Sequence, residues 1–124
     1  MSLDKLIKEC IKDFEIIPNK KKQIKDDMVG LTSKITELKD ILNNIESKIY
    51  LEEILTDKDL KNEKSRNAML IVLLLEHKDY KINQKMLREH ETSKGYLESD
   101  LMKLRAKVTL YGIISKFTEE KKNE

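Results

Sequence analysis

Residue types that characterise several other classes of protein are scarce in this 124-residue chain. It has one Cys, one Pro, three Gly and no Trp, and aromatic residues make up 5% of it. One cysteine excludes an intramolecular disulfide framework, and so few aromatic residues disfavour an all-β core. Neither sign of charge dominates, because 25 Lys and Arg residues stand against 23 Asp and Glu residues. The composition predicts an all-α protein of a reducing compartment that does not require an anionic partner.

The motifs of common catalytic, metal and nucleotide sites are also missing. His77 and His90 do not have the spacing of a two-histidine zinc motif, and no Walker A or dinucleotide-binding glycine motif occurs. Cys10 lies among apolar residues, so we expect a buried structural thiol rather than a nucleophile. We therefore predict no catalytic residue, no metal site and no cofactor, and we expect that the protein is not an enzyme.

A long apolar segment is absent as well. The chain opens with charged residues scattered among apolar ones, without the uninterrupted apolar core of a signal peptide. Its longest apolar run, from Ala68 to Leu75, is far shorter than the ~20 residues that cross a bilayer. We expect a soluble protein of the cytoplasm without membrane contact.

One regular pattern dominates the first half of the sequence. Apolar residues alternate there in steps of four and three, the repeat of a helix that packs against a long partner helix. They are Ile24, Met28, Leu31, Ile35, Leu38, Leu42, Ile45 and Ile49. Ser2 is placed to cap a shorter helix before this row, and Pro18 is expected to end that helix because proline disrupts a helix interior.

The second half predicts two more helices. Asn62 is placed to cap the first of them and Asp79 to cap the second. The second carries another row in steps of three and four, formed by Tyr80, Asn83, Leu87, His90, Lys94, Leu97, Leu101, Leu104, Val108 and Tyr111.

We therefore expect one helical domain over 1–124, an antiparallel coiled-coil-like bundle of two long and two short helices. Its parts are an N-terminal helix over 1–17, a long heptad helix over 19–55, an apolar helix over 62–78, a long helix over 79–117 and a polar tail over 118–124.

The apolar run leaves its helix without a polar side. From Ala68 to Leu75 every face is apolar, so one groove of the same chain cannot cover it. In one interpretation two copies meet through this helix, and in the other the long helices bend around the run and bury it. We favour self-association into a homodimer or higher homo-oligomer. The predicted interface consists of Met69, Ile71, Val72 and Leu74.

Two polar residues interrupt the row of the last helix. If His90 and Lys94 are buried, they form a polar layer that fixes the register of the helices or receives an anionic group. Alternatively the row frays at this point and both side chains face water. We favour the second interpretation, because an unpaired buried Lys is costly.

Basic residues gather near residue 20 and again near residue 105. Candidates for phosphate contacts are Lys20, Lys21, Lys22, Lys103, Arg105 and Lys107. Phosphate binding requires little more than clustered cations. Acidic residues are interleaved along the last helix, however, and there is no aromatic platform for base stacking. We favour a solvated charged surface and keep nucleic-acid binding as the alternative.

Two stretches of the C-terminal half carry a recognisable pattern, NEKSRNAMLIVLLLEHKDY and LESDLMKLRAKVTLYGII. Its key positions are Asn62, Glu63, Arg66, Asp79, Tyr80, Leu97, Leu101, Leu104 and Arg105. From Asn62 to Ile114 the chain resembles small helical proteins encoded by phages and prophages of Gram-positive bacteria. It departs from them in the fully apolar run, where their helix is more often amphipathic.

The resemblance implies a setting rather than an activity, among phage proteins that act on replication, recombination or host defence. We therefore expect a non-enzymatic protein-interaction module whose partner is a host or phage protein complex. Our hypothesis for its role in that setting is inhibition of a host nuclease or of a CRISPR-type defence complex. The alternative is a nucleic-acid-binding accessory protein of phage recombination or replication.

Overall fold

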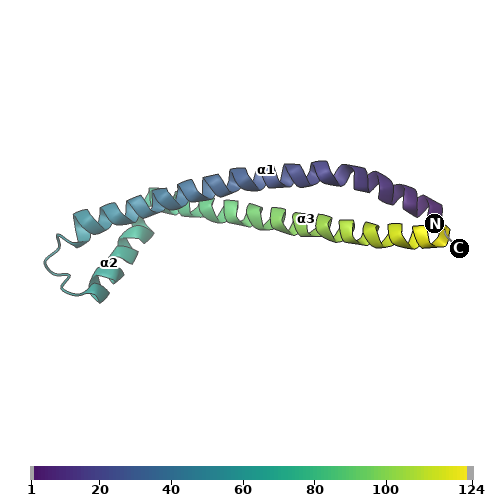
Figure 1. Ribbon diagram of the computed structural model, residues 1–124. Helices are drawn as coiled ribbons and strands as arrows, with labels where there is room; N and C mark the ends of the chain where they lie inside the picture. The colour runs from purple at the N-terminus through teal and green to yellow at the C-terminus, as the bar shows by residue number, and fades with distance from the viewer. Residues whose placement is uncertain (1, 123–124) are drawn as a thin grey trace. The chain divides into compact units, whose positions relative to one another are not determined.

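The computed structural model describes residues 2–122, with the side chains of residues 118 and 120–122 excepted. This part of the chain is all-helical, as predicted, and contains no strand (Figure 1). It comprises the helices α1 (Leu3–Ile49), α2 (Glu63–Glu76) and α3 (Lys78–Lys122) and a π-helical turn, η1 (Tyr50–Ile54). Two compact units can be distinguished, a terminal unit (Met1–Gly30 and Lys94–Glu124) and a central unit (Leu31–Ser93). Their boundary falls inside the two long helices rather than in a linker.

Helix α1 continues through Pro18, so the prediction of separate helices over 1–17 and 19–55 is wrong. Proline has no N–H to donate, and its ring crowds the carbonyl one turn earlier. The apolar row nevertheless keeps its phase on both sides of the proline, and Ile17 is 4% exposed. We infer that packing of this row outweighs the lost hydrogen bond. The helix begins as expected, since the Lys5 N–H donates to Ser2 Oγ at 3.3 Å, while Met1 lies outside the described residues.

At its other end α1 passes into η1, where the sequence predicted a regular helix to residue 55. The wider turn is closed by the Leu55 N–H, which donates to the Tyr50 carbonyl at 2.9 Å. An uninterrupted α-helix would turn Glu52 inward one step after Ile49. The π turn instead brings Ile54 into the core, where its exposure is 0%.

The core of the central unit forms where η1 and α2 meet. Its buried residues are Ile49, Ile54 and Leu74, and Ile45, Tyr50, Leu60, Leu70, Leu73 and Tyr80 pack around them. Asn62 caps α2 as predicted, because its side chain accepts the Ser65 N–H at 2.8 Å. The Asn62 N–H in turn donates to Ser65 Oγ, so the cap is reciprocal.

Helix α3 begins at Lys78, and the residue that caps it is His77 rather than Asp79. The Tyr80 N–H donates to His77 Nδ1 at 3.1 Å, while the His77 N–H donates to the Leu74 carbonyl at 3.2 Å. The backbone of His77 is extended, so one residue ends α2 and starts α3. The predicted polar tail over 118–124 is helical as far as Lys122, and residues 123–124 lie outside the described part of the chain.

In the terminal unit the first part of α1 lies beside the last part of α3 (Figure 1). The rings of Phe14 and Tyr111 meet edge to face with their centroids 6.3 Å apart. The Tyr111 hydroxyl donates to Asp13 Oδ2 at 3.0 Å. Every residue of the predicted row on α3, from Tyr80 to Tyr111, is buried or half-buried. The same holds for the predicted row on α1, so both rows face the interior of their units.

Replacing Leu38 or Leu42 with Ala should lower the free energy of unfolding by about 2–5 kcal/mol, because each truncation leaves a cavity in a packed row. These side chains are 6% and 7% exposed. Urea unfolding followed by circular dichroism measures the effect. Val29 is 70% exposed, so the control Val29→Ala should change stability by less than about 0.5 kcal/mol. Wild-type midpoints for both Leu variants would contradict the packing of the α1 row.

Candidate functional site

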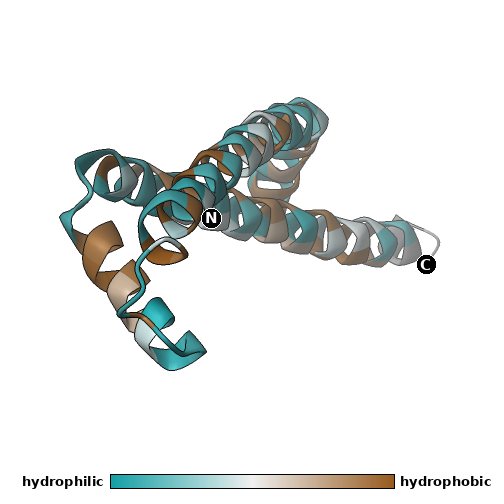
Figure 2. Cartoon of the chain, turned by 90° about the vertical axis from the view of Figure 1, so that its left-hand side faces the viewer, coloured by the Kyte–Doolittle hydropathy of each residue, from teal (hydrophilic) through white to brown (hydrophobic). Residues whose placement is uncertain are grey.

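Helix α2 buries only one of its apolar sides. Leu70, Leu73 and Leu74 turn toward the core of the central unit. On the opposite side Ile71, Val72 and Leu75 are 59%, 48% and 62% exposed, within the apolar stretch of α2 that is brown in Figure 2. The alternative in which the chain buries the whole run is therefore wrong. We call Met69, Ile71, Val72 and Leu75 the outer face of α2.

Leu74 does not belong to this face, although the sequence analysis placed it at the interface. It is buried against Ile49 and Ile54. At 100° per residue, side chains four positions apart share a side of a helix, so Leu74 lies with Leu70 and Leu75 lies with Ile71. Which pair turns outward depends on how α2 packs against Ile49 and Ile54. The apolar run does not predict this, because all its residues are apolar.

The π turn adds two exposed leucines next to α2. Leu51 and Leu55 stand four residues apart on η1 and its C-terminal end, and both are exposed. Element η1 contacts α2, and the buried Ile54 packs in the same cluster as Leu74. The sequence did not identify these leucines as a site, because their outward direction follows from the π turn.

The hollow between η1 and α2 has an acidic character. It measures about 340 Å³ and is lined by Lys48, Ile49, Glu52, Glu53, Leu73, Glu76 and His77. Among the described residues, no group of three or more His, Cys, Asp or Glu side chains is placed to hold a metal ion. His77 already accepts a hydrogen bond through Nδ1.

A hydrogen bond joins α1 to α3 inside the central unit. The Tyr80 hydroxyl donates to Glu46 Oε1 at 2.7 Å. This bond to a carboxylate, together with partial burial and the negative charge of Glu46, raises the pKa of Tyr80 above its ordinary value of 10.0. Folding therefore favours the neutral phenol. Its contribution to stability is present below about pH 10 and is lost as the pH rises through the raised pKa.

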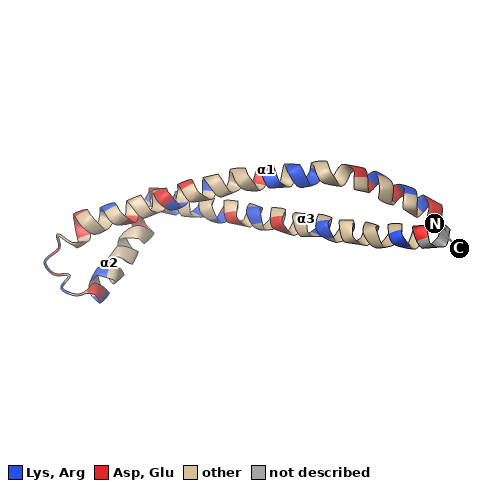
Figure 3. Ribbon diagram, in the orientation of Figure 1, with Lys and Arg blue, Asp and Glu red and all other residues tan. Residues whose placement is uncertain are grey.

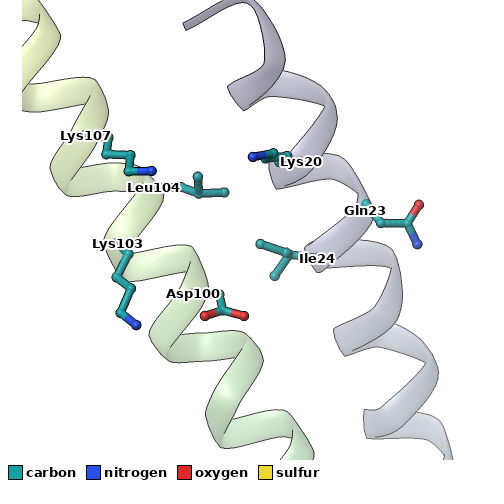
Figure 4. A pocket seen from close by; sticks show the side chains of 7 residues that line it. All are labelled: Lys20, Gln23, Ile24, Asp100, Lys103, Leu104 and Lys107. Atoms are coloured by element: carbon teal, nitrogen blue, oxygen red, sulfur yellow. The ribbon is translucent and has the colours of Figure 1, made fainter. Parts of the chain in front are cut away.

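In the terminal unit, three of the six predicted phosphate contacts surround one hollow of about 330 Å³ (Figure 4). They are Lys20 from α1 and Lys103 and Lys107 from α3. Figure 4 shows Lys20 and Lys107 extending toward the space between the two helices. Asp100 also lines this hollow and lowers its positive charge.

The other three predicted contacts lie elsewhere. Lys21 is half-buried and stands three residues before Ile24 on α1, whereas Lys22 and Arg105 are exposed and do not line the hollow. Along most of both long helices basic and acidic side chains alternate (Figure 3). The gathering of Lys20, Lys103 and Lys107 around one hollow is therefore a local feature of the terminal unit.

His90 and Lys94 both keep their places on the α3 row. Each is half-buried, and no polar or charged residue of the described chain is fully buried, so neither a fully buried polar layer nor full exposure to water describes them. The helix does not fray at this point, and its regular turn holds both positions in phase with the apolar residues. A Lys at such a position packs its aliphatic stem and keeps its ammonium at the edge of the contact.

Cys10 is half-buried rather than buried. It lines an apolar hollow of about 630 Å³ in the terminal unit, together with residues of both long helices that include Ile7, Phe14 and Tyr111.

We compared the chain with protein families, curated proteins and solved structures. No protein-family model, no curated protein and no solved structure matches this chain. Within the described residues, no helix combines the length and the apolar character needed to span a bilayer. The resemblance to small phage proteins therefore rests on the motifs of the C-terminal half alone.

Lys94→Leu should raise the free energy of unfolding by about 1 kcal/mol, because it places apolar surface at a half-buried position of the row. Chemical denaturation measures the change, and Lys85→Leu, at an exposed position of the same helix, is the matched control with an expected change below about 0.5 kcal/mol. A loss of stability, or a different oligomeric mass in light scattering, would show instead that the ammonium is paired or fixes the assembly.

Proposed function

We propose that the protein is a non-enzymatic interaction module that associates with a second copy of itself through the outer face of α2. The observation that carries this proposal is the exposure of Ile71, Val72 and Leu75 on one side of a short helix. The sequence places no charged residue between Ala68 and Leu75. A helix that is apolar on all sides is normally buried on all sides.

The scaffold that presents this face is an antiparallel coiled-coil-like hairpin in our proposal. Two observations support it. The rows of α1 and α3 both advance in steps of three and four, and both face inward. In the terminal unit an early residue of α1, Phe14, meets a late residue of α3, Tyr111.

We favour a second copy as the occupant of the outer face of α2. Isolated proteins rarely expose contiguous apolar patches larger than a few hundred Å², and a standard stable interface buries about 800 Å² per partner. The outer face of α2 offers four exposed apolar side chains, and Leu51 and Leu55 are exposed as well on η1 and at its C-terminal end. In a two-fold dimer the outer face of α2 serves both partners, and no further protein is needed.

The setting of the module is a further part of the proposal, supported by the resemblance to phage proteins. A dimer of this kind would act on a host or phage protein complex, as an inhibitor of a host nuclease or of a CRISPR-type defence complex. Inhibition would come from occupying a surface, since the proposed module has no catalytic residues.

Nucleic-acid binding is the second candidate, and the convergence of Lys20, Lys103 and Lys107 on one hollow favours it. If it is right, duplex DNA should bind at low salt and lose affinity steeply as salt rises, because counterions are released. Fluorescence anisotropy of labelled DNA measures this. Replacing all three lysines with Gln should flatten the salt slope, whereas replacing Lys58, Lys61 and Lys64 should not. No binding at low salt would remove this candidate.

Ile71→Lys or Val72→Lys should convert a dimer into a monomer, because each places a charge in the middle of the apolar contact. Size-exclusion chromatography with light scattering over a hundredfold dilution gives the mass. Val29→Lys is the matched control, since Val29 is 70% exposed and has only polar residues one turn away on either side. Circular dichroism should show unchanged helix in all variants.

A wild-type monomer at every concentration would contradict the dimer. In that case the outer face of α2 would be the docking surface for a different protein.

A further inference from the structure

The last part of α3 carries a second row of apolar residues. Its members follow one another in steps of four, four and three and are Met102, Ala106, Leu110 and Ile113. Met102, Leu110 and Ile113 are 68%, 52% and 61% exposed, and Ala106 is exposed too. We call these four residues the outer row of α3. It falls on the side away from the inner row that contains Leu104 and Tyr111, because the two rows differ in phase by about half a helical turn.

The spacing of the outer row is that of a helix contact. Steps of three and four keep side chains on one line along a helix, and that line suits a second helix laid beside it. Inside the terminal unit α1 covers the inner row of α3. Leu101 and Leu104 of that row are buried, and so is Ile17 of α1. The outer row therefore has the geometry to receive one more helix.

The charges beside the outer row are of one sign. From Leu101 to Phe117 the chain has four cations, Lys103, Arg105, Lys107 and Lys116, and no acidic residue. All four are exposed. Lys103 and Lys107 lie on one flank of the row and Arg105 and Lys116 on the other, as their positions around the helix dictate. In Figure 3 the C-terminal part of α3 is blue and tan, with red only near its end.

We propose that the outer row of α3 is a docking site for a partner helix that is apolar on one side and acidic on its flanks. The charges decide between occupants. A second copy of the same row would set cations against cations, which weakens association, whereas acidic flanks would meet Lys103, Arg105 and Lys107 with opposite charge. This is the groove-and-helix mode of recognition, with apolar anchors for affinity and flanking charges for selectivity.

A membrane is the less suitable occupant. An anionic bilayer would also attract basic flanks, but it imposes no spacing on the apolar residues. The regular steps of the outer row over 102–113 match the contact positions of a helix, so a partner helix explains this spacing and a lipid surface does not.

The proposal is tested with two synthetic helical peptides that carry leucine in steps of three and four. One has glutamate on both flanks and the other has lysine at the same positions. Fluorescence anisotropy with labelled peptide should show binding of the glutamate peptide and at least tenfold weaker binding of the lysine peptide. Ile113→Lys, which charges the row, and Arg105→Glu, which changes only an exposed flank, should each weaken binding of the glutamate peptide at least tenfold.

Two controls separate this site from the outer face of α2. Ile71→Lys and Val29→Lys should leave the affinity for the glutamate peptide unchanged, so a failure of the proposed dimer would not affect this result. The inference is overturned if the glutamate peptide does not bind, or if Ile113→Lys leaves its affinity intact. It is also overturned if phosphatidylserine vesicles bind and the peptide does not. A lower oligomeric mass of the peptide-free Ile113→Lys variant in light scattering would overturn it too, because the row would then be a contact between copies of this chain.

Discussion

The packing of an apolar row on α1 and an apolar row on α3 is the interaction on which the rest of this chain depends. Within each unit these rows use one side of each helix. The buried Leu38, Leu42, Leu101 and Leu104 belong to them, and the buried Ile17 stands seven residues before Ile24, in phase with the α1 row. The remaining sides carry a charged surface of nearly balanced sign. Exposed apolar side chains also occur elsewhere on the chain, and the regions on α2 and on α3 are the two that we propose as binding surfaces.

At two places on α1 the packing of the row outweighs a local preference of the backbone. Pro18 removes a hydrogen bond that an α-helix interior normally has, yet α1 continues because Ile17 and the residues on either side remain in phase with the row. At the other end of α1 the row itself would turn Glu52 inward, and the chain adopts a π turn that buries Ile54 instead. In both places the burial of a large apolar side chain decides the backbone geometry.

The balance between packing and local backbone preferences also explains how much of the fold the sequence alone could predict. Both rows, the helical class and the Asn62 cap follow from spacing and from local hydrogen bonding, and the structure confirms them. The passage through Pro18 and the capping role of His77 depend on how local preferences balance against packing, so local rules predicted them wrongly. Leu74 and Leu75 are equivalent in the sequence pattern. Only the way α2 docks on η1 sends one inward and the other outward.

The two apolar regions differ in the charges around them, and this gives them different physical characters. No charged residue falls between Ala68 and Leu75, so association through α2 would be driven by apolar burial and would be strengthened by salts such as sulfate. The outer row of α3 has exposed cations on both flanks, so docking there would gain from charge attraction and weaken as salt screens it. A single chain can therefore hold two contacts that respond to ionic strength in opposite directions. Because their key residues lie on different helices and in different units, occupation of one does not use the side chains of the other.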